Sequence, residues 1–191
     1  MSKKIKGEFI MENMFRDLRA DEIDVRIAQV KENGVSLLLY KDARVDQNIL
    51  DETVTPFRWQ REHKELKGNI YCGISIYDEE RKQWVTKWDV GKESFSEAEK
   101  GEASDSFKRA GFNWGIGREL YTAPFIWINA EDCNLFETNK KDAYGKPIWT
   151  CRDKFEVEKI EIKDKEITGL AIKNMSLKGR RVFVYFIKEE K

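Results

Sequence analysis

Alternating apolar and polar residues recur along the chain in short runs, which is the pattern of β-strands with one buried face. One such run, residues 22–32, and a continuous apolar run, residues 35–41, flank Asn33-Gly34, a dipeptide typical of two-residue hairpin turns. Further strand-like runs follow in both halves of the chain. They are residues 57–61, 70–77, 84–90, 125–128, 155–162, 167–172 and 182–187. The pattern therefore predicts many short strands joined by turns.

Two segments have the apolar spacing of an amphipathic helix. The first is residues 41–55, which Pro56 ends, and the second is residues 100–121. The second segment places six apolar or small residues on one stripe, namely Ala103, Phe107, Ala110, Trp114, Gly117 and Tyr121. A short helix is also predicted at residues 14–18, whereas residues 129–152 are polar and predict a loop. Strands, then a long helix, then strands again indicate an α+β fold, with an antiparallel sheet backed by the long helix and extra C-terminal strands.

Three cations of the 100–121 helix, Lys100, Lys108 and Arg109, fall off the apolar stripe and can face a ligand. Packing of the stripe would hold Lys108-Arg109 rigidly, so that the pair loses little freedom when it binds a phosphate. Lysine makes a point contact, whereas arginine grips two phosphate oxygens at once. Asp105 is expected to pair with Arg109 four residues on and to fix its direction. The alternative interpretation is a solvated helix face.

Composition limits the function classes. Hydrophobic residues make up 40% of the 191 residues, which is enough for a core. The 35 basic and 35 acidic residues cancel, so a nucleic-acid surface requires charge that is segregated onto one face. No apolar run approaches the ~18 residues needed to span a membrane, and the N-terminus does not resemble a secretion signal. We therefore expect a soluble, cytoplasmic protein.

No catalytic, metal or cofactor site is predicted. Cys72, Cys133 and Cys151 are widely spaced without a C-x-x-C pair, and we expect reduced thiols. His63 lies in a segment rich in charge, residues 61–65, and is expected to be a surface residue in a turn. The chain contains no phosphate-binding loop pattern, and therefore no recognisable motif for ATP hydrolysis. These observations favour a protein that is not an enzyme.

The order of these features resembles that of the Rad-fifty-two-like single-strand annealing proteins, the recombination mediators of eukaryotes and many bacteriophages. A hairpin ends at Tyr40, a helix follows, and strands containing Trp59 and Trp88 lead to the run KGEASDSFKRA at residues 100–110. The resemblance covers about residues 20–128. It implies a β-β-β-α annealing core at residues 21–128, preceded by an arm at 1–20 and followed by a β-rich extension of the same domain at 129–191.

The resemblance also implies which residues contact DNA. In that family single-stranded DNA runs in a basic groove, and the groove's Lys-Arg pair corresponds to Lys108 and Arg109. Four further positions match groove residues, namely Arg26, Tyr40, Arg44 and Lys100. Where some members carry a third arginine after the pair, this chain has Phe112, so the groove is less basic here or uses the ring for stacking. Ion pairs for the arginines and a core position for Tyr40 are the alternatives, and the tryptophans are interpreted as core or subunit contacts.

The function implied by the resemblance is ATP-independent binding and annealing of complementary single strands in homologous recombination and double-strand break repair. The family works as homo-oligomeric rings or arcs, and a single-strand-binding protein is a further partner. The short length suggests a bacteriophage source. Two alternatives stay open: a DNA-end-protecting protein that does not anneal, and a protein-interaction module that does not bind DNA. A hydrolase is disfavoured, because no nucleophile and base can be paired.

Overall fold

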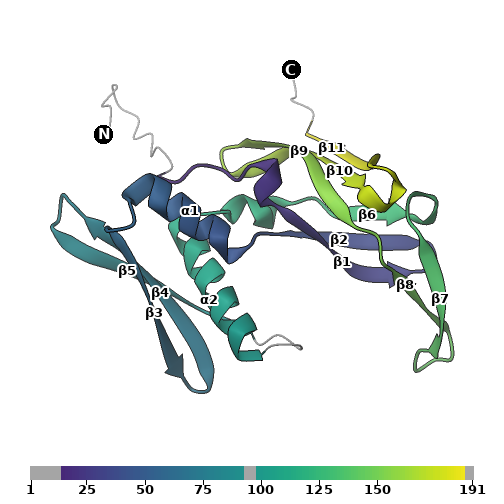
Figure 1. Cartoon of the computed structure of the whole chain (residues 1–191), viewed down its shortest axis with the longest axis horizontal. Coiled ribbons are helices and arrows are strands. Elements are labelled where there is room, and N and C mark those ends of the chain that lie inside the picture. The colour runs from purple at the N-terminus through teal and green to yellow at the C-terminus, as the bar shows by residue number, and fades with distance from the viewer. Residues whose placement is uncertain (1–13, 93–97, 188–191) are drawn as a thin grey trace. The chain divides into compact units, whose positions relative to one another are not determined.

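The computed structural model describes residues 14–92 and 98–187, except for the side chains of residues 98–100, as two compact units (Figure 1). Unit 1 comprises the described parts of Met1–Arg16 and Ala43–Gly117. Unit 2 comprises Asp17–Asp42 and the described part of Arg118–Lys191. Antiparallel strands occur in both units and α-helices in unit 1, so the predicted α+β class is confirmed. The predicted boundaries after residues 20 and 128 stay predictions, and most of the predicted arm lies outside the described residues.

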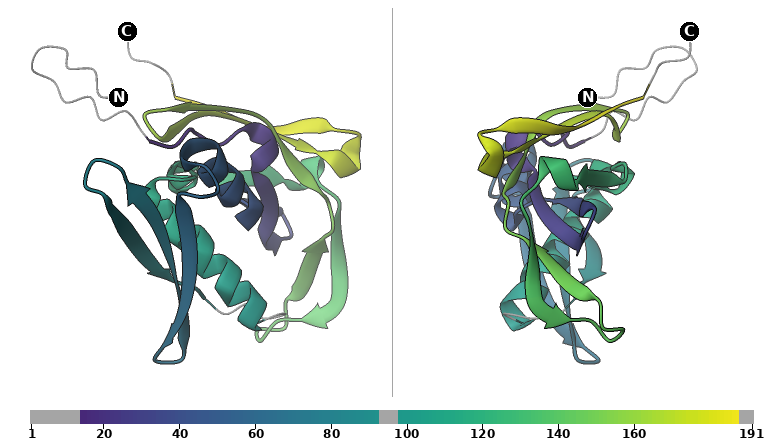
Figure 2. Two further views of the ribbon diagram at one scale, coloured as in Figure 1. Left: turned by 60° about the vertical axis from the view of Figure 1, so that its left-hand side comes forward. Right: turned by 90° about the vertical axis from the view of Figure 1, so that its right-hand side faces the viewer.

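Unit 1 combines a three-stranded antiparallel sheet with two helices. Its strands are β3 (Trp59–Leu66), β4 (Asn69–Asp78) and β5 (Gln83–Val90), in that spatial order. Helix α1 (Ala43–Val54) precedes the strands, and helix α2 (Ala98–Trp114) follows them. Figures 1 and 2 show α2 lying across one face of this sheet. The predicted order of three strands followed by a long helix is therefore confirmed.

The apolar side of α2 is held against the sheet by Phe107 and Ala110, whose exposed fractions are 1% and 0%. The Trp59 ring centroid lies 6.2 Å from that of Phe107, and the Arg61 guanidinium lies over the Phe107 ring at 5.2 Å. Both partners project from β3 on the same side, because every second residue of a strand points to one face. Burying a side chain the size of phenylalanine stabilises the fold by about 1.5–3 kcal/mol.

Polar contacts tie both ends of α2 to the sheet. Near the start of the helix, the buried Glu102 carboxylate accepts the Ile70 N–H at 2.7 Å. At its end, Lys87 Nζ donates to the Asn113 carbonyl at 2.9 Å and lies 4.4 Å from the Trp114 ring centroid. A cation at this end pairs with a carbonyl that the helix leaves unsatisfied and matches the negative end of the helix dipole. The helix is thus held to the sheet from Glu102 to Trp114.

The helix predicted over residues 100–121 is too long at its C-terminal end. α2 ends at Trp114, and Gly115 and Gly117 follow with φ values of +95° and +70°. Such left-handed backbone suits glycine and interrupts the helical hydrogen bonds. Gly117 is buried outside α2, and Tyr121 lies in a 3-10 helix with 66% of its surface exposed. The predicted stripe was wrong at these two positions, because residue spacing does not register the break.

Unit 2 is built around a six-stranded antiparallel sheet. Its strands are β1 (Asp24–Lys31), β2 (Gly34–Tyr40), β6 (Ile126–Asn129), β9 (Phe155–Lys163), β10 (Glu166–Asn174) and β11 (Arg180–Phe186). The spatial order is β11-β10-β9-β1-β2-β6, and β1 with β2 forms the predicted hairpin. Short 3-10 helices are η1 (Ala20–Glu22), η2 (Arg118–Thr122), η3 (Ala130–Asp132) and η4 (Met175–Leu177). The buried core consists of Val35, Leu37, Ile126, Ile128, Cys133, Phe155, Ile167, Leu170 and Ile172.

Residues 129–152, predicted to be a loop, contain a two-stranded hairpin instead. Strand β7 (Leu135–Lys141) pairs with β8 (Pro147–Cys151), and the Asp142 carboxylate accepts two N–H groups of the connecting turn at 2.8 and 2.9 Å. The hairpin extends as a separate ribbon at one end of unit 2 (Figure 2). Much of it is exposed, so neither strand carries the alternating pattern of a half-buried strand. The loop prediction was wrong for that reason.

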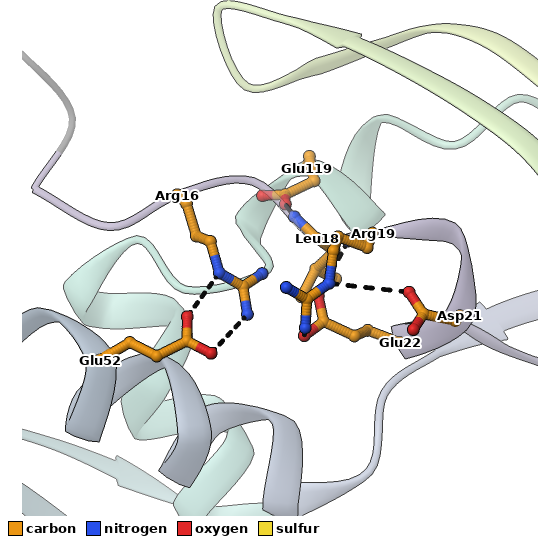
Figure 3. Close-up of polar contacts among 7 residues, drawn as sticks. All are labelled: Arg16, Leu18, Arg19, Asp21, Glu22, Glu52 and Glu119. Carbon is orange, nitrogen blue, oxygen red and sulfur yellow. Dashed lines mark hydrogen bonds and ion pairs between the residues drawn. The ribbon is translucent and has the colours of Figure 1, made fainter.

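Residues 14–18 do not form the predicted short helix and are held by side-chain contacts (Figure 3). In unit 1, the Arg16 guanidinium donates to the Glu52 carboxylate of α1 at 2.7 Å. In unit 2, the buried Glu119 carboxylate accepts the Leu18 N–H at 2.8 Å. These carboxylates thus supply partners to an extended segment that has no strand or helix ladder of its own.

Glu158 of β9 is the centre of an ion cluster in unit 2. Arg181 donates to its two carboxylate oxygens at 2.5 and 3.0 Å, and Lys173 Nζ lies 3.2 Å from the carboxylate. The two-pronged hydrogen bond from Arg181, reinforced by Lys173, lowers the pKa of Glu158 from 4.5 to about 2.

Replacing Glu158 with Gln should remove a stability contribution that depends on pH. Because the pKa is lowered on folding, the contribution is complete above about pH 4.5 and is lost as the pH falls toward about 2. Urea unfolding of the unchanged protein and of Glu158→Gln should be measured at a series of pH values. The free energies of unfolding should differ at neutral pH, and the difference should shrink as the pH falls through this range. Glu137→Gln, at an exposed position on β7, is the control; a difference for Glu158→Gln that stays constant with pH would contradict the assignment.

Gly91, which follows β5, leaves room for the backbone of α2. A Cβ added at Gly91 would lie 2.2 Å from the Glu102 carbonyl oxygen, and this oxygen belongs to helix backbone that cannot easily move. We expect Gly91→Ala to lower the free energy of unfolding by about 1–3 kcal/mol, measured by urea denaturation. Gly68→Ala is the control, since nothing lies within 4 Å of its added Cβ. Its left-handed φ of +76° gives alanine a backbone cost of about 1 kcal/mol there, so the steric effect is the excess cost at Gly91. Equal costs would argue against the steric explanation.

Candidate nucleic-acid interface

Lys108 and Arg109 lie side by side on α2 and are both partly exposed. Their neighbours on either side, Phe107 and Ala110, are buried against the sheet. Burial of these two neighbours fixes the helix rotation, so the cationic pair has to lie away from the buried stripe. Within the described part of the chain, Lys108 forms no ion pair, and its ammonium group is available to a ligand.

Arg109 is oriented by Asp89, which the sequence did not suggest. The Arg109 Nε donates to Asp89 Oδ1 at 3.3 Å, and Asn113 Nδ2 donates to Asp89 Oδ2 at the same distance. Asp89 Oδ1 also accepts the Val90 N–H at 2.8 Å, so the carboxylate is itself held in place. The guanidinium has four further N–H groups in a planar fork, which suits a phosphate.

The predicted partner of Arg109, Asp105, has a different role. Its Oδ2 accepts the Lys92 N–H at 3.0 Å, which ties α2 to the segment after β5. The prediction of an Asp105–Arg109 pair was therefore wrong. A spacing of four residues allows such a contact, but the tertiary fold brings a second carboxylate closer to the guanidinium. Strand alternation was the available signal, because it places Asp89 on the same side of β5 as Lys87, which contacts the helix.

The other predicted contacts of unit 1 lie on its helices. Arg44 is exposed in the first turn of α1, and Lys100 lies in the first turn of α2, where its side chain is outside the described residues. Phe112 stands where some members of the resembled family carry a third arginine, and it is partly buried on α2.

Arg26 and Tyr40 lie on one face of the β1–β2 hairpin in unit 2. Arg26 is opposite Leu38 and Asp24 is opposite Tyr40 in the strand register, which places all four side chains on one face. Arg26 is exposed, and Tyr40 is 40% exposed rather than part of the core. The pKa of Tyr40 is raised mainly by partial burial and, to a smaller extent, by the nearby Asp24 carboxylate. Its hydroxyl therefore stays protonated at neutral pH and can donate a hydrogen bond.

The structure thus brings the predicted residues together in two groups, Lys108 with Arg109 on α2 and Arg26 with Tyr40 on the β1–β2 face. Each group combines a guanidinium with a second donor, an ammonium in one and a phenol in the other. Such donors suit phosphate oxygens, which are the same at every nucleotide, so the two groups suit recognition that is independent of sequence.

The thiols and the histidine have environments that suit structural roles. Burial raises the pKa values of Cys72 and Cys133 to about 11, and it also raises the pKa of Cys151, so these groups stay protonated and poorly nucleophilic at neutral pH. His63 is exposed as predicted, but it lies within β3 and not in a turn, with Nε2 3.3 Å from the Ala103 carbonyl oxygen. Residues 14–92 and 98–187 contain no cluster of three metal-binding side chains, and none of their helices is long and apolar enough to cross a membrane.

Comparison with known proteins finds a partial similarity to one family and to one relative. Residues 40–134 match the family described as Rad52/22 family double-strand break repair protein, a segment that contains the predicted contacts except Arg26. The single-stranded DNA-binding protein DdrA of Deinococcus radiodurans is 35% identical over 102 residues. This match covers 50% of the chain and 46% of the relative, so the chain spans less than half of that relative's length. No solved structure matches the chain.

A double-mutant cycle should identify the partner of Arg109. Combining Asp89→Asn with Arg109→Gln is expected to give a coupling energy of about 0.5–1 kcal/mol in urea unfolding, because the pair is partly exposed. The matched cycle of Asp105→Asn with Arg109→Gln should give a coupling near zero. The reverse result would mean that Arg109 pairs with Asp105 within α2 and that Asp89 does not orient it.

Proposed function

The chain is Rad52-like across residues 40–134, and from this we propose that it binds single-stranded DNA during DNA repair and recombination. The observation that carries the proposal is the Lys108-Arg109 pair, which is held on a packed helix within the matched segment. The name of the Deinococcus relative supports the same ligand. Arg26, Tyr40, Arg44 and Lys100 are proposed as further contacts.

The physical basis is pre-organised neutralisation of phosphate. Because Phe107 and Ala110 are buried, the helix backbone under the two cations does not have to be ordered when DNA binds. Asp89 adds a fixed direction for the guanidinium, although it also offsets part of its charge. The resulting contacts are individually modest, so a useful affinity requires several of them along one strand.

A net charge of zero is compatible with this function. Attraction of DNA depends on the local field at the cations and not on the sum over the chain. The 35 acidic residues balance the basic ones in number, yet carboxylates such as Glu158 and Glu119 are engaged in their own hydrogen bonds in unit 2. The field is expected to be short-ranged and strongly reduced by salt.

The finer proposal is annealing by a homo-oligomer. Copies arranged in a ring or arc would align their cationic helices into one track that holds the backbone and leaves the bases open to a complementary strand. Pairing and stacking of the bases would drive the reaction, so neither ATP nor a covalent step is required, and the protein is not an enzyme in this scheme. A single-strand-binding protein is a proposed second partner, since it would coat the same substrate.

Three measurements separate annealing from the alternatives. Faster duplex formation on mixing complementary oligonucleotides supports annealing, whereas protection from exonuclease without faster pairing supports an end-binding protein. Absence of any DNA affinity at low salt would instead support a protein-interaction module.

Replacing Lys108 and Arg109 together with alanine should abolish most single-strand binding without unfolding the protein. Loss of two charge-assisted contacts is worth about 3 kcal/mol, an affinity loss on the order of 100-fold. In fluorescence anisotropy with oligo(dT), the slope of log K against log salt should become shallower by about 1.4, or about 0.7 for each lost phosphate contact.

The control is Lys140→Ala with Lys141→Ala, which removes the same charge from exposed positions on β7. Circular dichroism and size-exclusion chromatography check fold and assembly for both variants. Equal affinity losses in both double variants would mean that only total charge matters, and a melted Lys108/Arg109 variant would mean that the pair is structural.

A further inference from the structure

Exposed aromatic and apolar side chains form a patch on the outer face of β2 and immediately before β6 in unit 2. Phe125, immediately before β6, is 77% exposed, and Leu38 and Tyr40 of β2 are 47% and 40% exposed. Core residues such as Val35 and Leu37 alternate with them along β2 and are almost fully buried. The patch is therefore the outer face of the same strands whose other face forms the core.

The strand register aligns this patch with a cation. Arg26 of β1 is opposite Leu38 of β2, and Ser36 is opposite Trp127 of β6. Extending the β2–β6 register by one step places Phe125 opposite Leu38. Arg26 and Leu38 thus lie side by side on neighbouring strands, which are spaced about 4.8 Å apart, and Phe125 lies just before the third strand, one step beyond the last β2–β6 pair.

The Phe125 ring lies beside the Trp127 ring. Their ring centroids are 6.4 Å apart with an angle of 17° between the planes, so the rings are nearly parallel. The Trp127 ring in turn lies against Gly34, where an added Cβ would be 2.8 Å from the ring. A glycine at the hairpin turn therefore lets the tryptophan lie close to β2, and the tryptophan supports an exposed phenylalanine.

We infer that Phe125, supported by Trp127, is a stacking surface for the bases of a single strand whose phosphates contact Arg26. This inference rests on the proposed single-strand binding and adds a base-contacting site to it. An exposed ring that its neighbour holds in place can stack on any base without reading its sequence. The surface from Arg26 to Phe125 combines a cation with a flat apolar surface, and this combination matches a nucleotide, which has a charged backbone and a planar base. The Asp24 carboxylate lies in the Tyr40 row, where Glu156 of β9 is its neighbour in the register, and not in line with Leu38.

The test compares oligo(dT) with an abasic oligonucleotide of the same length in fluorescence anisotropy. We expect Phe125→Ala to weaken oligo(dT) binding by roughly tenfold. Binding of the abasic strand should be unchanged, because it has phosphates but no bases. The salt dependence of binding should also be unchanged, in contrast to the Lys108/Arg109 variant. Phe125→Trp, which keeps a flat ring, should restore the affinity.

Phe186→Ala is the matched control, since Phe186 is 66% exposed on β11 of the same unit. Equal losses on both oligonucleotides, or no loss on oligo(dT), would overturn the stacking site while leaving the proposed function in place. A changed oligomer size for Phe125→Ala in size-exclusion chromatography would overturn it in favour of a subunit contact. If the unchanged protein does not bind oligo(dT) at low salt, both the proposed function and this inference are wrong.

Discussion

Burial of the Phe107 side of α2 against β3, β4 and β5 is the contact on which the arrangement of unit 1 depends. It sets the rotation of the helix about its axis, and the polar contacts of Glu102 and Lys87 set its position along the sheet. Lys108 and Arg109 gain their orientation from this packing, because they are neighbours of buried residues in the sequence. A cationic pair on a loose helix would lose more freedom on binding a phosphate backbone.

The proposed recognition of single-stranded DNA uses electrostatic contacts in unit 1 and mainly base stacking in unit 2. In unit 1 the cations act on phosphates, and the Asp89 carboxylate restrains Arg109 while it reduces its net charge. In unit 2 the outer face of β1, β2 and β6 offers rings and a single guanidinium. Phosphate contacts are weakened by salt, whereas stacking is largely insensitive to it, so the two kinds of contact have separable signatures.

Local signals predicted those elements that carry an apolar run, an apolar–polar alternation or a helical spacing. The Asn33-Gly34 turn, the alternation before it and the apolar run after it identify the β1–β2 hairpin, and the spacing around Phe107 identifies α2. The β7–β8 hairpin escaped prediction because much of its surface is exposed and its strands lack an apolar face. The C-terminal end of α2 escaped because Gly115 and Gly117 adopt left-handed backbone, which apolar spacing does not reveal.

The sequence by itself determined the α+β class, the similarity of residues 40–134 to the Rad52/22 family and the place of Lys108-Arg109 on a helix, because these depend on residues close together in the chain. Only the tertiary structure decided that Arg109 pairs with Asp89 and not with Asp105, and that Phe125 stacks on Trp127 over Gly34. Side chains choose partners by distance in space. The strand register and the rotation of a packed helix set those distances, and neither can be deduced from a spacing of four residues.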